Sequence, residues 1–185
     1  MRVANRQRGF TLIELLIVVA LILIISALAV PRFLRARIAA NEASAAASLK
    51  QVGIANAAYF ALYQVGYAGN LAALGPPGGG CGSVSTSCAD MLDSLLSGVN
   101  PSTATPIKSG YTFTYFAAND PPTVGTPNTT YAVVATPTTP NSSGQSTFCF
   151  DNSIAIMKDS QGGITSADDS GCKATWPVGG TVGPL

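Results

Sequence analysis

The segment Gly9-Phe10-Thr11-Leu12-Ile13-Glu14 and the apolar run that follows it decide the fold of this chain. Within residues 10–30, only Thr11, Glu14 and Ser26 are not hydrophobic. A helix of about 21 residues is roughly 31 Å long, which is enough to cross a bilayer core of about 30 Å. A carboxylate inside such a run is costly and is usually functional. The run therefore predicts a membrane-spanning helix in which Glu14 has a role.

A secretory signal peptide is the nearest alternative, because it also combines a basic start, an apolar stretch and a small-residue cleavage site. Residues 1–9 are basic, and Ala27-Leu28-Ala29 would serve as the cleavage site. The apolar run, however, exceeds the usual length of about 7–15 residues for a signal-peptide core. An ordinary membrane anchor is the second alternative, but it explains neither Gly9 nor Glu14.

The stretch RGFTLIELLIVVALILIISALAVPRF, residues 8–33, resembles the N-terminus of a type IV prepilin, or of the related pseudopilins of type II secretion. The resemblance extends to about Tyr67 and is most specific at Gly9, Phe10 and Glu14. It implies that a membrane peptidase cuts between Gly9 and Phe10 and then methylates the new amino group of Phe10. It also implies that mature subunits pack into a filament through this helix, with the Phe10 amine of one subunit against Glu14 of a neighbour.

Composition argues against an enzyme. The chain has 185 residues, a net charge of +1 and 10% charged residues, well below the usual 25% or so. It has no histidine, which removes Ser-His-Asp and Cys-His nucleophile pairs and every histidine-based metal site. No catalytic constellation stands out and no cofactor is expected. We therefore expect a structural protein that is the substrate of a peptidase and a methyltransferase.

The four cysteines predict disulfides in an oxidising compartment. Cys81, Cys88, Cys149 and Cys172 allow three pairings. We favour Cys81–Cys88 and Cys149–Cys172, because each pair lies within one apparent structural unit. A four-thiolate zinc site is the alternative, but the spacing lacks the C-x-x-C knuckles typical of such sites.

The helix is expected to continue beyond the membrane to about Tyr63, for about 53 residues or roughly 80 Å. Pro31 lacks an N–H donor, so we expect a kink or a local loosening there that helps assembly. Arg35, Glu42, Lys50 and Gln51 fall largely off the apolar face of the second half. That face is formed by residues at helical spacing: Leu34, Ile38, Ala45, Leu49, Val52, Tyr59 and Tyr63.

The rest of the chain predicts an α+β fold, with the long N-terminal helix packed on an antiparallel sheet of about four strands, as in pilins. Strands are expected at residues 111–116, 131–136, 147–150 and 153–158. Asp151-Asn152 predicts a tight hairpin turn between the last two strands. A short helix is expected at residues 87–96, with Asp90 near its positive end.

These elements predict four regions. Residues 1–9 form a leader and residues 10–63 the long helix, with residues 10–30 as membrane span and filament core. Residues 64–107 form a connecting loop with a short helix, and residues 108–185 the sheet and a disulfide-bounded tail.

Charge alone does not orient the chain in the membrane. Arginines flank both ends of the apolar run, Arg2, Arg6 and Arg8 on one side and Arg32, Arg35 and Arg37 on the other. The predicted disulfides place the C-terminal part outside. We therefore expect a single-pass protein of the bacterial inner membrane that becomes an extracellular filament after assembly.

The sequence offers candidate residues for two further ligands, calcium and DNA. Asp168 with Asp169, and Asp151 with Asp159, are candidate calcium ligands, but their spacing does not match a calcium loop and no metal is expected. Arg32, Arg35 and Arg37 with Lys50 are candidates for DNA phosphates. Arginines beside an apolar span more commonly extend toward the lipid boundary, so DNA is a weakly supported partner.

Three functions are therefore compatible with the sequence. The first is a type IV pilus subunit that polymerises with copies of itself through an inner-membrane assembly machinery and serves adhesion, twitching motility, surface colonisation or DNA uptake. The second is a pseudopilin of type II secretion, although residues from Tyr111 onward lack the expected calcium-binding pattern. The third is a secreted binding module behind an ordinary signal peptide.

Overall fold

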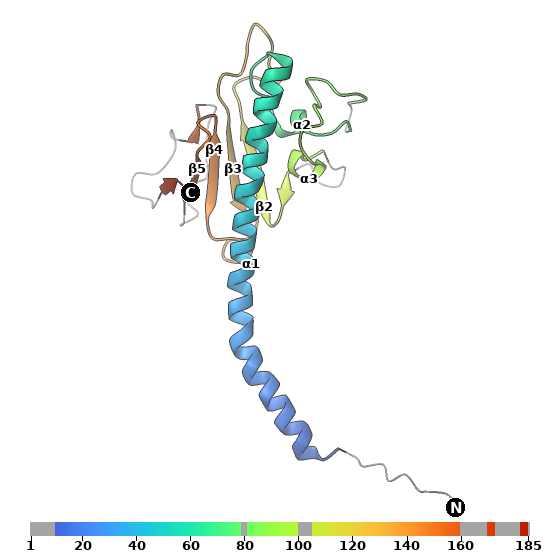
Figure 1. Cartoon of the computed structure of the whole chain (residues 1–185), viewed down its shortest axis with the longest axis vertical. Coiled ribbons are helices and arrows are strands. Elements are labelled where there is room, and N and C mark those ends of the chain that lie inside the picture. Colours follow the sequence, from blue (N-terminus) through green and yellow to red (C-terminus); the bar gives the residue numbers. More distant parts are fainter. Residues whose placement is uncertain (1–9, 79–80, 100–104, 160–169, 173–181, 185) are drawn as a thin grey trace, which may run out of the picture. The chain divides into compact units, whose positions relative to one another are not determined.

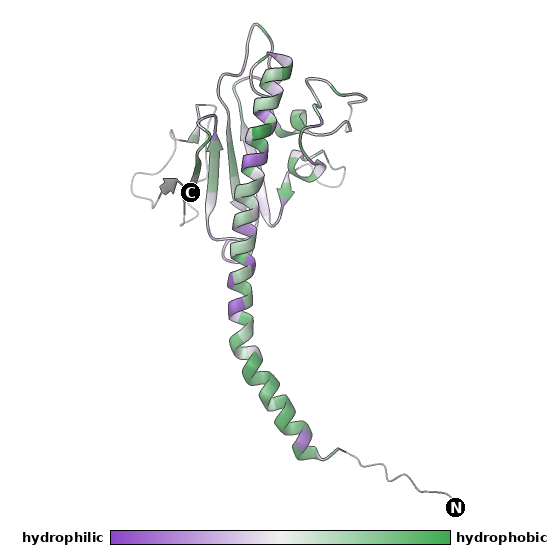
Figure 2. Cartoon of the chain, viewed as in Figure 1, coloured by the Kyte–Doolittle hydropathy of each residue, from purple (hydrophilic) through white to green (hydrophobic). Residues whose placement is uncertain are grey.

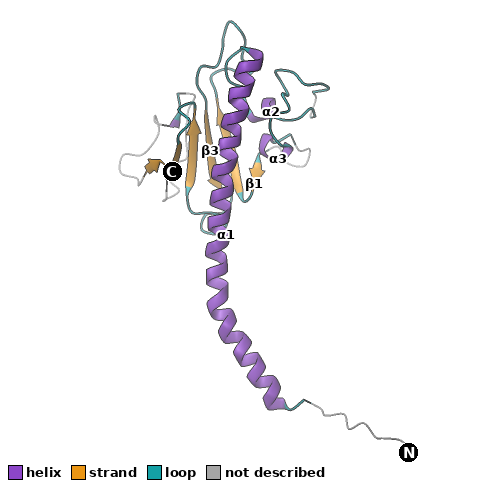
Figure 3. Ribbon diagram, viewed as in Figure 1, coloured by secondary structure: helices purple, strands orange, loops and turns teal. Residues whose placement is uncertain are grey.

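The computed structural model describes residues 10–78, 81–99, 105–159, 170–172 and 182–184. The chain divides into two compact units, residues 1–37 and residues 38–185. The longest element is helix α1, Leu12–Tyr63, which contributes to both units (Figure 1). Among the described residues, the other elements are two short helices and one antiparallel sheet (Figure 3). The predicted α+β architecture, a long N-terminal helix and an antiparallel sheet, is confirmed.

In the first unit, the helix presents only apolar surface over most of its length (Figure 2). Every described residue from Phe10 to Arg37 is exposed. The helix runs through Pro31 without a break, because one missing N–H donor removes a single bond of the helical ladder. Loosening at Pro31 during assembly stays a prediction.

The second unit is built on a six-stranded sheet in which sequential strands are neighbours. All pairings are antiparallel, and Phe113 pairs with Ala135 on the next strand. The strands are β1 (Ile107–Lys108), β2 (Tyr111–Phe116), β3 (Ala132–Pro137), β4 (Thr147–Asp151), β5 (Ile156–Asp159) and β6 (Val182–Pro184). The four predicted strands correspond to β2–β5. The two short edge strands, β1 and β6, were not predicted, because two or three residues carry no readable alternation.

The predicted tight turn at Asp151-Asn152 is wrong. Phe150 pairs with Ile156, and β4 ends at Asp151, so residues 152–155 form a longer connection between β4 and β5. The Asp151 side chain organises it by accepting hydrogen bonds from the backbone N–H and hydroxyl of Ser153. Ile154 then turns back with φ +67°. An aspartate that binds the backbone two residues later forms an Asx turn, which competes with a two-residue hairpin.

The connection between α1 and the sheet holds two short helices, α2 (Leu71–Leu74) and α3 (Ser94–Ser97). α2 was not predicted, and the helix expected at residues 87–96 is only the four residues of α3. The N-cap of α3 is Asp93, whose carboxylate accepts hydrogen bonds from the N–H groups of Leu95 and Leu96. Asp90 instead lies in the left-handed region, at φ +56°, before the helix begins.

One face of the sheet packs against the second half of α1 and forms the main core. As predicted from helical spacing, Ala45, Leu49, Val52 and Tyr59 are buried. Leu34, predicted on the same face, is exposed because it belongs to the first unit. Tyr63 is partly buried against the core.

The core also contains polar helix residues that were not predicted, Ser48 and Asn56. Asn56 is fully buried, and its Oδ1 accepts hydrogen bonds from the Ala68 N–H at 3.1 Å and from the Tyr115 hydroxyl at 3.0 Å. Within the described residues, its Nδ2 has no hydrogen-bond partner. Periodicity did not find Asn56, because an amide oxygen that accepts hydrogen bonds across the core has no signature in the local sequence. The opposite sheet face carries a smaller cluster of Ala132, Val134, Cys149 and Cys172, with Phe116 and Met157 at its edge.

Candidate functional site

The first turn of α1 is organised by Thr11 and Glu14. The Thr11 N–H and hydroxyl donate hydrogen bonds to Glu14 Oε2 at 2.9 Å and 2.7 Å. The Glu14 N–H donates in return to Thr11 Oγ1 at 3.3 Å. This reciprocal arrangement is a capping box, which satisfies backbone donors that a helix start otherwise leaves free. The T-x-x-E pattern at residues 11–14 carries this signal, and our sequence reasoning did not use it.

The capping box explains how a carboxylate can stand in an apolar segment. One oxygen of Glu14 is occupied by two donors from Thr11, and the negative charge lies at the positive end of the helix dipole. Phe10 precedes the helix, and its side chain is 89% exposed. Gly9 lies outside the described residues, so the structure describes only the Phe10 side of the expected cleavage site. Phe10 and Glu14 thus stand together at the start of α1.

The helix segment that follows Glu14 has an apolar surface that no other described part of the chain covers. Large side chains such as Leu12, Ile13 and Leu28 are between 65% and 81% exposed. Within the described residues, α1 contains the one helix stretch long and apolar enough to cross a membrane. A helix that is apolar all round must be buried in lipid or among other helices.

The cations beyond this segment are exposed on the same helix. Arg32, Arg35 and Arg37 make no ion pair in the part of the chain that the structure describes. The ion pairs found there join Lys108 to Asp93 and Lys158 to Glu42.

Glu42 was placed off the apolar face by the sequence, but the structure gives it a structural role. Its Oε1 accepts hydrogen bonds from the N–H groups of Gln145 and Ser146, both at 3.1 Å. Its Oε2 lies 3.0 Å from the Lys158 ammonium on β5. Partial burial raises the pKa of Glu42, but Lys158 and the two backbone donors outweigh this and hold the pKa below its usual value.

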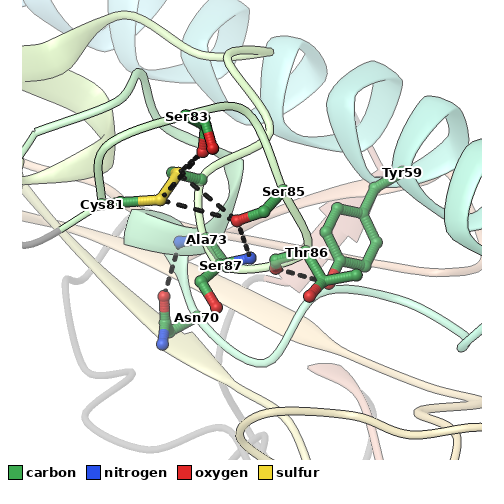
Figure 4. The surroundings of a disulfide bond; sticks show 9 residues. Tyr59, Asn70, Ala73, Cys81, Ser83, Ser85, Thr86 and Ser87 are labelled. Carbon is green, nitrogen blue, oxygen red and sulfur yellow. Dashed lines mark hydrogen bonds between the residues drawn. A yellow bond between two sulfur atoms is a disulfide. The ribbon is translucent and has the colours of Figure 1, made fainter.

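The structure pairs Cys81 with Cys88 and Cys149 with Cys172, the pairing favoured from the sequence. The first bridge closes a loop that lies against α1, where the Tyr59 hydroxyl donates to the Thr86 carbonyl at 2.7 Å (Figure 4). Burial is the main reason that the pKa of Tyr59 rises to about 12, so its hydroxyl remains a donor.

The second bridge joins β4 to the segment that carries Cys172. The N–H of Cys172 donates to Asp151 Oδ2 at 3.0 Å, so Asp151 connects this segment to the β4–β5 connection. Asp151 is therefore engaged as a structural acceptor. Asp159, the candidate named with Asp151, is buried on β5. Asp168 and Asp169, the second candidate pair, lie outside the described residues. Within the described ranges, no group of three potential metal ligands comes together.

Known proteins are similar in sequence to the N-terminal part of this chain. Residues 4–30 match the model of the family described as the prokaryotic N-terminal methylation motif. The N-terminal segment of the chain is thus similar to this motif. Over 55 residues it is 44% identical to the type IV major pilin protein PilA of Myxococcus xanthus (strain DK1622).

This similarity is confined to a part of each chain. It covers 30% of this chain and 25% of the relative, so the chain matches about a quarter of the length of that relative. No solved structure matches this chain. Both similarities concern the N-terminal part of the chain, where α1 is long and apolar enough to cross a membrane.

Proposed function

We propose that this chain is the structural subunit of a type IV pilus, made as a prepilin that is cleaved between Gly9 and Phe10 and methylated on the Phe10 amine. One observation carries the proposal. An apolar helix surface that no described residue of the chain covers begins directly after the exposed Phe10 and its capped neighbour Glu14. A surface of this kind suits a segment that leaves lipid only to enter a bundle of identical helices.

Glu14 gives the proposed filament its register. Cleavage would create a positive amine on Phe10, close to a carboxylate that already occupies the helix start. In the filament, the amine of an incoming subunit would meet Glu14 of a neighbour, and methylation would retain its positive charge. Breaking such a pair in an apolar core costs about 3–5 kcal/mol, so a subunit in the wrong axial position would be strongly disfavoured.

A pilus is preferred to a pseudopilus because the relative with 44% identity is named a major pilin. The proposed partners are further copies of the chain, a prepilin peptidase with N-methyltransferase activity and an inner-membrane assembly machinery. Before assembly the first unit would span the inner membrane, with the disulfide-bonded second unit outside. Adhesion and twitching motility are the activities proposed for the filament. For Arg32, Arg35 and Arg37, a position at the lipid boundary is preferred to a role in DNA binding.

The experiment that tests this function combines mass analysis with microscopy. The mature chain should begin with N-methylated Phe10, and shear preparations of cells should contain filaments made of it. A mature chain that begins at Val30 would show an ordinary signal peptide and refute the proposal. Processed chain without surface filaments would favour the pseudopilin.

A further inference from the structure

A hollow of about 370 Å³ opens on the surface of the second unit, between α1 and the connection from β4 to β5. On the side of the hollow that α1 forms, Gly53 and Ala57 contribute almost no side-chain volume. A Cβ atom at Gly53 would lie 2.5 Å from the ring of Phe150. Glycine is therefore needed for that ring to approach the helix backbone, and no larger residue of α1 fills the space.

Aromatic rings line much of the hollow. The rings of Tyr67 and Tyr131 meet edge to face, with centroids 4.7 Å apart and an interplanar angle of 62°. Phe150 follows at 6.4 Å from Tyr131, tilted by 49°. The lining thus combines ring edges and ring faces, which is the surface that another aromatic ring prefers.

Two isoleucines stand at the mouth of the hollow and are poorly covered. Ile54 on α1 is 72% exposed, and Ile154 on the β4–β5 connection is 82% exposed. Ile154 has a φ of +67°, which is unfavourable for a β-branched residue, and its N–H donates to the Asp151 carbonyl at 3.1 Å. The fold thus holds an apolar side chain outward at a conformational cost, and a ligand in the hollow would cover it.

A single charged side chain belongs to the described lining, that of Lys50. Lys50 is exposed, and the ion pairs of the described residues involve Lys108 and Lys158 instead. An apolar, aromatic hollow with one available cation at its edge complements a molecule that is apolar except for one negative group.

We propose that this hollow binds a small aromatic carboxylate of one or two rings, with the rings against Tyr131 and Phe150 and the carboxylate beside Lys50. The volume decides the size of the ligand, because about 370 Å³ lies at the small end of the roughly 300–1,000 Å³ typical of ligand sites. The site is independent of filament formation and of the methylation motif.

Photolabelling of the full chain in nanodiscs of zwitterionic lipid tests the site. The probe is 4-benzoylbenzoate, an aromatic carboxylate that cross-links on illumination, and labelled peptides are mapped by mass spectrometry. Labels are expected at Ile54 or Ile154. An excess of 2-naphthoate should protect these positions, and the uncharged 2-naphthamide should protect less well. Lys50→Gln should weaken protection by naphthoate by about fivefold, as for an exposed charge pair.

Two matched variants separate binding in the hollow from adhesion to the helix surface. Ala57→Leu fills the hollow and should abolish labelling, whereas Ala61→Leu adds the same side chain at an exposed α1 position outside the lining. Near-UV circular dichroism confirms that both variants fold. Equal labelling of the two variants, or equal protection by acid and amide, would overturn the proposal. If labelling falls as the density of the chain in the membrane rises, a second copy of the chain occupies the hollow. This result would also overturn the proposal.

Discussion

The Glu42 carboxylate of α1 lies 3.0 Å from the Lys158 ammonium of β5, although 116 residues separate them in the sequence. The same carboxylate accepts hydrogen bonds from the N–H groups of Gln145 and Ser146 on the β3–β4 connection. Asn41 reaches that connection as well, with its side-chain amide donating to the Ser143 carbonyl at 2.8 Å. The part of α1 that begins the second unit is thus bound to the sheet through polar contacts, before the apolar core begins at Ala45.

Glu42→Gln should destabilise the second unit by about 1–3 kcal/mol at neutral pH, because hydrogen bonds to a charged acceptor are lost. The low pKa of Glu42 means that its stabilising contribution is complete above its unfolded value, near 4.5, and is lost as the pH falls through the lower folded value. The difference between wild type and variant should therefore shrink as the pH is lowered below 4.5. Urea unfolding in non-ionic detergent at pH 7 and at acid pH measures this difference. Lys50→Gln is the control, and an equal loss of stability at both pH values would contradict the charge argument.

Glu14→Gln should insert into the membrane and lose its leader normally, yet form few or no filaments, because the amide cannot pair with the Phe10 amine of a neighbour. Immunoblots measure processing, and electron microscopy of sheared cell surfaces measures filaments. Thr11→Val is the matched variant, since it removes the capping hydroxyl but leaves the Glu14 charge. It should reduce filaments less than Glu14→Gln. Abundant filaments from Glu14→Gln would refute the pairing, and failed cleavage would assign Glu14 to peptidase recognition.

Gly9→Val should block removal of residues 1–9, because a peptidase that cuts at the membrane face requires close approach to the backbone there. Mass spectrometry of the membrane fraction shows whether the precursor accumulates. Gln7→Val places the same side chain two positions earlier and should be processed at the normal rate. Normal processing of Gly9→Val would show that the cleavage site has been misplaced.

The two disulfides should contribute unequally to stability. Removing either pair by double replacement with alanine should cost about 2–4 kcal/mol, and the longer loop should cost about 1 kcal/mol more on the chain-entropy account. Cys149 and Cys172 are 23 residues apart, whereas Cys81 and Cys88 are 7 apart, so loss of the Cys149–Cys172 bridge is expected to be more severe. Denaturant unfolding of the two double variants ranks them. Peptide mapping of the oxidised wild type should find two bridges, and free thiols or bound zinc would contradict the assignment.

Pro31→Ala restores a backbone donor in α1 and should still insert into membranes. If the proline eases helix loosening in the filament, the variant should assemble more slowly or less completely. A density map of wild-type filaments should then show a loosened helix near residues 27–35. An unbroken helix through that range would show that Pro31 has no such role in assembly.

Local sequence patterns predicted the structural elements whose signal is contained within a single segment of the chain. The apolar run with Glu14 predicted the exposed helix segment, and spacing along α1 predicted the buried Leu49, Val52 and Tyr59. Alternating aromatic and threonine residues predicted β2, and proximity in the sequence favoured the pairing found for the cysteines. Each of these signals depends on a repeat of two or 3.6 residues, or on a short separation, which a single segment contains in full.

Only the tertiary structure decided the features that depend on two segments at once. Asn56 is a core residue whose amide oxygen accepts hydrogen bonds from Tyr115 and Ala68, and Glu42 is a structural residue because β5 brings Lys158 to it. The hollow beside Gly53 exists because the ring of Phe150 approaches the backbone of α1. Burial, charge pairing and concave surface arise when distant segments meet, and one segment's sequence does not contain the other half of such a contact.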